Sequence, residues 1–150
     1  MALMAEAQEN PAVIAAIAAS YLRQGRALDR ISRGLTLLGV GGILAGTYAS
    51  APLAVSGLAA LAVLFGLIQS YFALRAGFDA DIFGHLAGNA FSTTNFDGAM
   101  KRLGLFAPDR PSRPMSERAR GAMTLVRRQA IFLALQVVSL LALPLLGVVL

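Results

Sequence analysis

Two long stretches of the chain carry no charged side chain. Between positions 34 and 74 the only ionisable groups are the hydroxyls of Tyr48 and Tyr71, and between positions 129 and 150 there are none. The hydrocarbon core of a membrane is about 30 Å thick, and about 20 helical residues cross it. The first stretch has 41 residues. As a single helix it would measure about 60 Å, so it predicts two crossings.

The break between these two crossings is expected near the middle of the first stretch. The least apolar residues lie at positions 48–51, and Pro52 suits the first turn of a new helix, which needs no backbone N–H. We therefore predict a transmembrane hairpin over 34–74, with spans at 34–49 and 52–74, and a third span at 129–150. A soluble helical protein is the alternative, but its core helices would keep a polar face, which these runs lack.

Composition supports the membrane interpretation. The chain is 57% hydrophobic and only 14% charged, with a mean hydropathy of +0.66. Soluble domains have about 45–50% apolar and about 25% charged residues. Cysteine is absent, which excludes disulfides and thiolate metal sites. Twelve of the 13 basic residues are arginine, a bias that together with the abundance of alanine indicates a bacterial genome rich in GC and hence a bacterial inner (plasma) membrane.

The basic residues also predict the orientation. Lysine and arginine favour the cytoplasmic side, and here they lie before the hairpin and between it and the third span. The N-terminal segment 1–33 and the loop 75–128 are therefore expected in the cytoplasm, and the C-terminus in the periplasm. The net charge of +5 is explained in this way, without nucleic acid as a partner. The arginines expected to contact lipid head groups are Arg23, Arg26, Arg30, Arg33, Arg118, Arg120, Arg127 and Arg128.

The cytoplasmic segments are predicted to be helical too. Asn10 and Pro11 are typical of a helix start, and an apolar stripe follows that extends into the first span, formed by Ile14, Ile17, Tyr21, Leu28, Ile31 and Leu35. This amphipathic helix would lie on the inner leaflet, pack on a partner, or cover the protein's own loop.

Within loop 75–128 we expect the helix of the second span to continue to Gly88. A short helix should then be capped by Thr94, with Asp97 three residues on, and end at Gly104. After a proline-rich linker at 107–114, the last helix should start at Ser116. A small apolar cluster is predicted to comprise Phe78, Ile82, Phe91, Phe96, Met100, Leu103, Leu105 and Phe106.

Small residues predict how the spans pack. Gly39, Gly42 and Gly46 share one face of the first span, and the second span has a row formed by Ala59, Ala62, Gly66 and Ser70. Such residues let helix backbones approach closely in lipid. We expect them to pack the hairpin together rather than to form a homodimer. Gln136 should face another helix, because an unpaired amide in lipid is costly, with Ser56, Ser70 or Thr47 as its partner.

Motifs for chemistry are scarce. Asp81 and His85 are four residues apart, with Asp79 close by, but a metal site needs three or four ligands, and we expect only a surface hydrogen bond between Asp81 and His85. No nucleophile elbow, phosphate loop or dinucleotide fingerprint is present. Transport is disfavoured because the spans contain no charged group. We therefore expect neither enzymatic activity nor a cofactor.

The resulting hypothesis is a small accessory, scaffold or assembly subunit of a larger membrane complex, with the lipid bilayer and another membrane protein, or a second copy of the chain, as partners. Two further hypotheses are a homo-oligomeric, holin-like pore and an immunity-type inhibitor of a membrane-acting toxin. A membrane enzyme that uses Asp79, Asp81 and His85 ranks last.

Overall fold

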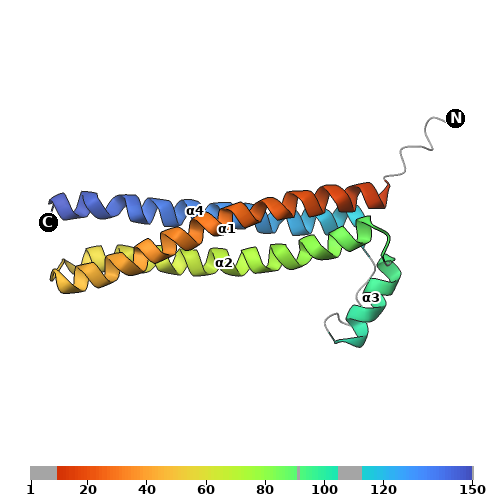
Figure 1. The fold of residues 1–150 in the computed structure, drawn as a ribbon, viewed down its shortest axis with the longest axis horizontal. Helices are drawn as coiled ribbons and strands as arrows, with labels where there is room; N and C mark the ends of the chain where they lie inside the picture. The colour runs from red at the N-terminus through yellow and green to blue at the C-terminus, as the bar shows by residue number, and fades with distance from the viewer. Residues whose placement is uncertain (1–9, 91, 105–112, 150) are drawn as a thin grey trace.

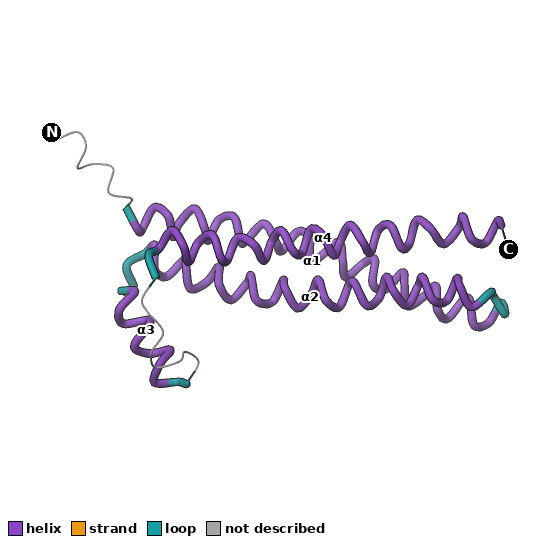
Figure 2. The backbone as a smooth tube through the Cα atoms, turned by 180° about the vertical axis from the view of Figure 1, so that it is seen from behind, coloured by secondary structure: helices purple, strands orange, loops and turns teal. Residues whose placement is uncertain are grey.

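The computed structural model describes residues 10–90, 92–104 and 113–149, and within these ranges all regular structure is helical. The helices are α1 (Pro11–Tyr48), α2 (Leu53–Ala87), α3 (Thr93–Arg102) and α4 (Met115–Val149). Figures 1 and 2 show α1, α2 and α4 side by side in an elongated bundle, with the short α3 projecting from one end. The expected all-helical bundle is confirmed.

Helix α1 begins where the sequence predicts. The Asn10 side chain accepts a hydrogen bond from the N–H of Ala12 at 3.0 Å, and Pro11 is the first helical residue. The helix then continues without interruption past Gly25 and Gly34 for 38 residues. The predicted amphipathic segment and the predicted first span therefore form one continuous helix.

A tight turn joins α1 to α2 at the position that the sequence predicts. Ser50 adopts a positive φ of 52°, and the N–H of Ala51 donates to the carbonyl of Gly46 at 2.9 Å. Helix α2 starts directly after Pro52 and runs without a break to Ala87, so the predicted continuation beyond the second span is confirmed. The turn lies at the same end of the bundle as the C-terminal end of α4 (Figure 1).

The start of α3 differs from the prediction. Ser92, not Thr94, is the N-cap: its hydroxyl accepts a hydrogen bond from the N–H of Asn95 at 3.1 Å. Thr94 is already the second helical residue, so its own N–H and carbonyl belong to the first turn. The predicted end of the helix is accurate, since Leu103 is the C-cap and Gly104 follows with a φ of 69°. Helix α4 starts at Met115, one residue before the predicted position.

The three long helices pack through buried residues spaced three, four or seven apart, the spacing of a coiled-coil seam. Most of these residues are small or polar. The seam comprises Ala15, Ala18, Leu22, Gly25, Ser32, Gly39 and Gly46 on α1, Ala59, Ala62, Gly66, Gln69, Ala76, Ala80 and Phe83 on α2, and Ala119, Ala122, Val126, Gln129 and Gln136 on α4.

The apolar stripe predicted for the N-terminal helix is wrong in part, because the buried face of α1 is the face of the seam. Ile17 and Ile31 are 58% and 55% exposed, and Tyr21 is exposed as well, while Ile14 and Leu28 pack against the core. The seam selects the alanine and glycine face because the helices approach closely there. The N-terminal half of α1 thus packs on α2 and α4 of its own chain.

The two halves of the bundle differ in what fills their interior and in where their charged residues lie. Its apolar core lies in the half nearer α3, built from Ala15, Leu22, Ala80, Phe83, Leu125 and their neighbours. In the half nearer the α1–α2 turn, the large apolar side chains face outward instead: Leu37 is 73% exposed and Leu141 is 66% exposed. Two of the described helices, α2 and α4, are long and apolar enough to cross a membrane.

Candidate functional site

The small residues of the predicted hairpin lie where α1 meets α2. A side chain at Gly39 would meet Val63 Cγ2 at 3.0 Å and the Ala59 carbonyl at 3.3 Å. A side chain at Gly42 would meet Ala59 Cβ at 3.5 Å, and one at Gly46 would meet the Ser56 hydroxyl at 3.2 Å. The three glycines therefore face α2 of the same chain, and an added Cβ would be most crowded at Gly39.

Gln136 is completely buried between α4 and α1. Its amide oxygen accepts from the Ser32 hydroxyl at 2.8 Å, and its amide nitrogen donates to the Thr36 hydroxyl at 2.9 Å and to the Ser32 carbonyl at 3.2 Å. The expectation that Gln136 faces another helix is confirmed. A methyl group at Gly66 would collide with the Thr36 hydroxyl and lie 2.6 Å from the Gln136 amide nitrogen, so Gly66 provides the space for this network.

The partners predicted for Gln136 are wrong. Ser70 donates to Asp29 of α1 at 3.4 Å, Thr47 donates to the Ile43 carbonyl within its own helix at 2.9 Å, and Ser56 lies beside Gly46. The physical reason is the register of the bundle. Gln136 lies in the half of the bundle nearer the α1–α2 turn, about two turns beyond Gln129. It is level with the segment of α1 that precedes Gly39 rather than with the turn itself.

Two further buried glutamines were not identified from the sequence. Gln69 of α2 is fully buried, and neither its amide nitrogen nor its amide oxygen has a hydrogen-bond partner among the described residues. Gln129 of α4 donates to the Phe72 carbonyl at 3.3 Å and packs against Gly25, while its oxygen has no partner there. Their three-and-four spacing with small residues along each helix was the signal that could have located them.

The arginines expected at lipid head groups have several environments. Arg33 pairs with Asp29 at 2.6 Å, and Arg26 lies 3.7 Å from Asp81. Arg128 lies over the ring of Phe72, 5.6 Å from its centroid. Exposed positions are held by Arg23, Arg30, Arg120 and Arg127.

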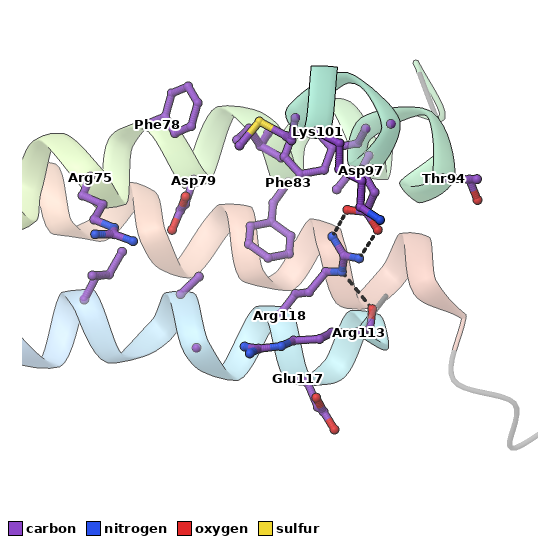
Figure 3. A pocket seen from close by; sticks show the side chains of 18 residues that line it. Arg75, Phe78, Asp79, Phe83, Thr94, Asp97, Lys101, Arg113, Glu117 and Arg118 are labelled. Carbon is purple, nitrogen blue, oxygen red and sulfur yellow. Dashed lines mark hydrogen bonds and ion pairs between the residues drawn. The ribbon is translucent and has the colours of Figure 1, made fainter. Parts of the chain in front are cut away.

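Arg118 differs from the other arginines because it joins α4 to α3. Its guanidinium makes two hydrogen bonds to the Asp97 carboxylate at 2.6 and 2.8 Å, and its Nε donates to the Arg113 carbonyl at 2.8 Å. Only 16% of its side chain is exposed. The sequence predicts that Asp97 supports the cap of α3. In the structure Asp97 forms this ion pair, which holds α3 to the bundle (Figure 3).

A cavity of about 1010 Å³, here called the α3 cavity, opens between α2, α3 and α4. Figure 3 shows Arg75, Asp79 and Phe83 of α2 on the side that faces α4, with the Asp97–Arg118 ion pair at the α3 end. Four residues of the predicted apolar cluster line this cavity: Phe78, Ile82, Phe96 and Met100. Leu103 is 71% exposed, and Phe91, Leu105 and Phe106 lie outside the described residues.

Asp79 has a perturbed carboxyl group. It is half-buried in the wall of the α3 cavity. Burial raises the pKa of its carboxyl above the ordinary value, and the positive charge of Arg75 opposes that rise. Among the described residues no group of three histidine, cysteine or acidic side chains could hold a metal ion. Asp81 lies instead beside Arg26, so the structure does not gather Asp79, Asp81 and His85 into a ligand set.

Comparison with protein-family models finds no match for this chain, and neither the curated proteins nor the solved structures provide a significant match.

Proposed function

We propose that the chain is a three-span protein of a bacterial inner membrane and that the half of the bundle nearer the α1–α2 turn is embedded in lipid. The observation that supports this is the change in side-chain character along the bundle: the half nearer the turn has no charged residue in 34–74 or 129–150 and a small or polar interior. In the embedded half, large apolar residues such as Leu37, Leu64 and Leu141 face outward, while glycine, alanine, serine and glutamine fill the interior. Exposed apolar surface of this extent is unfavourable in water and favourable in lipid.

The register of the bundle supports three spans of similar depth. Gln129 of α4 lies beside Phe72 of α2 and Gly25 of α1, so the three residues mark one level of the bundle. From that level α1 and α4 run toward the end of the bundle where the α1–α2 turn lies, and α2 has come from it. From that level about 20 residues of each helix remain, enough to cross the hydrocarbon core. The charged residues of α1 beyond this level all lie within about its first two to three turns, at the inner boundary of the layer; they are Arg26, Asp29, Arg30 and Arg33. Asp29 pairs with Arg33, and the exposed arginine side chains would extend to the head groups.

Within the membrane we propose a non-enzymatic role as an accessory or scaffold subunit of a larger complex. The glycines that could have formed a homodimer or a pore face α2 of the same chain, which favours an intramolecular use. The cytoplasmic half, with exposed charged and apolar side chains, α3 and the α3 cavity, would provide the docking surface. The embedded apolar exterior would anchor that surface and contact the spans of a partner.

The topology is tested by cysteine labelling, because the chain has no native cysteine. A cysteine at Ser50, in the turn, should react with a membrane-impermeant thiol reagent added to intact cells, and a cysteine at Asn95, on exposed α3, should react only after lysis. Labelling of both positions in intact cells, or recovery of the chain from the aqueous fraction without detergent, would contradict the proposed membrane insertion.

The scaffold role is tested separately. Affinity purification in mild detergent should recover a stoichiometric membrane complex, whereas purified protein in liposomes should neither release a trapped dye nor conduct ions. Dye release that Gly42→Leu abolishes would support the pore instead.

A further inference from the structure

The α3 cavity has an apolar wall that remains unfilled by the described residues. Phe78 and Ile82 of α2, Phe96 and Met100 of α3, and Leu125 of α4 contribute to it. Its volume of about 1010 Å³ lies at the upper end of the range found for small-molecule sites, about 300–1,000 Å³. The part of α2 that lines it, from Arg75 to Leu86, measures about 16 Å along the helix axis. The cavity is therefore long and suited to an extended apolar chain.

The charges around this wall are unequal. Arg118 and Asp97 neutralise each other through two short hydrogen bonds, and in Figure 3 the side chain of Glu117 points away from that pair. The remaining basic groups of the lining are Arg75, Lys101 and Arg113, opposed by two acidic groups, Asp79 and Glu117.

These charges are also separated in space. Asp79 and Arg75 are one turn apart on α2, so each offsets the other. Lys101, at the end of α3, and Arg113, before α4, have exposed side chains. With Glu117 as the one unpaired acidic group there among the described residues, the α3 end of the cavity has a net positive charge next to an apolar wall.

We propose that the α3 cavity binds a single-chain anionic amphiphile, such as a long-chain fatty carboxylate, with its head group at Lys101 and Arg113 and its chain along Phe78, Ile82 and Leu125. A carboxylate gains charge-assisted hydrogen bonds from the two basic side chains, and the chain leaves water for the apolar wall. A cationic amphiphile of the same length would meet repulsion at the same end. This site is additional to the proposed scaffold role and does not depend on the identity of the partner complex.

Two amphiphiles with the same chain test the proposal. Full-length protein in nanodiscs of neutral phosphatidylcholine is equilibrated with radiolabelled dodecanoate or dodecyltrimethylammonium, and binding to empty nanodiscs is subtracted. We expect saturable binding of one dodecanoate per chain, about tenfold tighter than that of the ammonium compound. The double variant Lys101→Gln/Arg113→Gln should lose this preference, whereas Arg120→Gln, an exposed arginine of α4 outside the cavity, should retain it.

A cavity-filling variant provides the second test. Gly121 lines the cavity, and a Cβ built there meets no atom within 4 Å, so Gly121→Leu should enter the cavity without disturbing the fold. The matched control is Gly77→Leu, at an equally open position of α2 that does not line the cavity. Helical circular dichroism confirms folding of both variants, and Gly98→Leu replaces Gly121→Leu if the latter is unfolded.

Loss of dodecanoate binding in the filled variant alone supports the proposal. Three results would overturn it: no saturable binding, equal binding of the ammonium compound, or binding that survives in the filled variant. None of these results bears on the cysteine labelling or on the purified complex, so the scaffold role stands or falls separately.

Discussion

Replacing Gly66 by alanine tests the packing of the proposed membrane half most directly. Gly66 lies opposite the network of Gln136 with Ser32 and Thr36, and an added methyl group would collide with the Thr36 hydroxyl and lie 2.6 Å from the Gln136 amide. These atoms belong to groups that are bonded to each other at 2.9 Å, so neither can move without breaking the network. The methyl group must therefore displace the hydroxyl, the amide, or the whole of α4.

The size of the effect follows from the bonds that are lost. Gln136 makes three hydrogen bonds to α1, each worth about 1 kcal/mol, and a buried amide left unsatisfied costs about 1–3 kcal/mol. Loss of two bonds with partial exposure of the amide gives about 2–4 kcal/mol. The higher helix propensity of alanine returns up to about 1 kcal/mol. The expected net destabilisation of Gly66→Ala is about 1–3 kcal/mol.

The assay is reversible unfolding in mixed micelles, followed by circular dichroism. The control is Gly57→Ala on the same helix, where a Cβ meets no atom within 4 Å, and it should be neutral or slightly stabilising. Adding Thr36→Ala should recover part of the loss in Gly66→Ala, because the collision is removed together with one hydrogen bond. Equal stability of Gly66→Ala and Gly57→Ala would refute the proposed packing of α1, α2 and α4.

Three further substitutions have expected outcomes. Gln69→Leu should raise the free energy of unfolding by about 1–3 kcal/mol in the same assay, because it removes two buried polar atoms that have no partner among the described residues; a loss of stability would show that they are paired. Asp79→Asn should stabilise the fold at neutral pH, because burial raises the pKa of this carboxyl and makes its charged form unfavourable. That gain should vanish as the pH falls below the ordinary pKa of aspartate, and a gain independent of pH would contradict the assignment. Asp97→Ala should increase amide hydrogen exchange within α3 and leave α1 unchanged, since the ion pair to Arg118 holds α3; unchanged exchange in α3 would contradict that role.

The helices could be predicted from the sequence because their ends depend on local chemistry. The Asn10 cap, the turn before Pro52 and the end at Gly104 all follow from residues within a few positions. The choice between Ser92 and Thr94 as cap was missed, because both residues can accept the same kind of hydrogen bond. The register between helices depends on contacts about 100 positions apart in the sequence, such as Ser32 with Gln136, and no local pattern contains it.

The candidate site was predictable to a lesser extent. The glycines of α1 and the small residues of α2 could be located because spacing alone places them on one face. In the N-terminal half of α1, the size of an apolar side chain does not predict its burial, since Ala15 and Ala18 are buried while Ile17 is exposed. The α3 cavity was anticipated only as an apolar cluster. Its basic rim depends on α3 lying beside the start of α4, where the Asp97–Arg118 pair holds it.

The two halves of the bundle must obtain the same helix register from different forces. In the half nearer α3, burial of residues such as Leu22 and Phe83 favours one alignment, because a slip would expose them to water. In the half nearer the turn, lipid would solvate the apolar side chains equally well before and after a slip, so the hydrophobic effect does not determine the register. There the helix register is set by the close contacts at Gly39 and Gly66 and by the hydrogen bonds of Gln136, each of which exists in one register only. Because α1, α2 and α4 are continuous through both halves, each half constrains the alignment of the other.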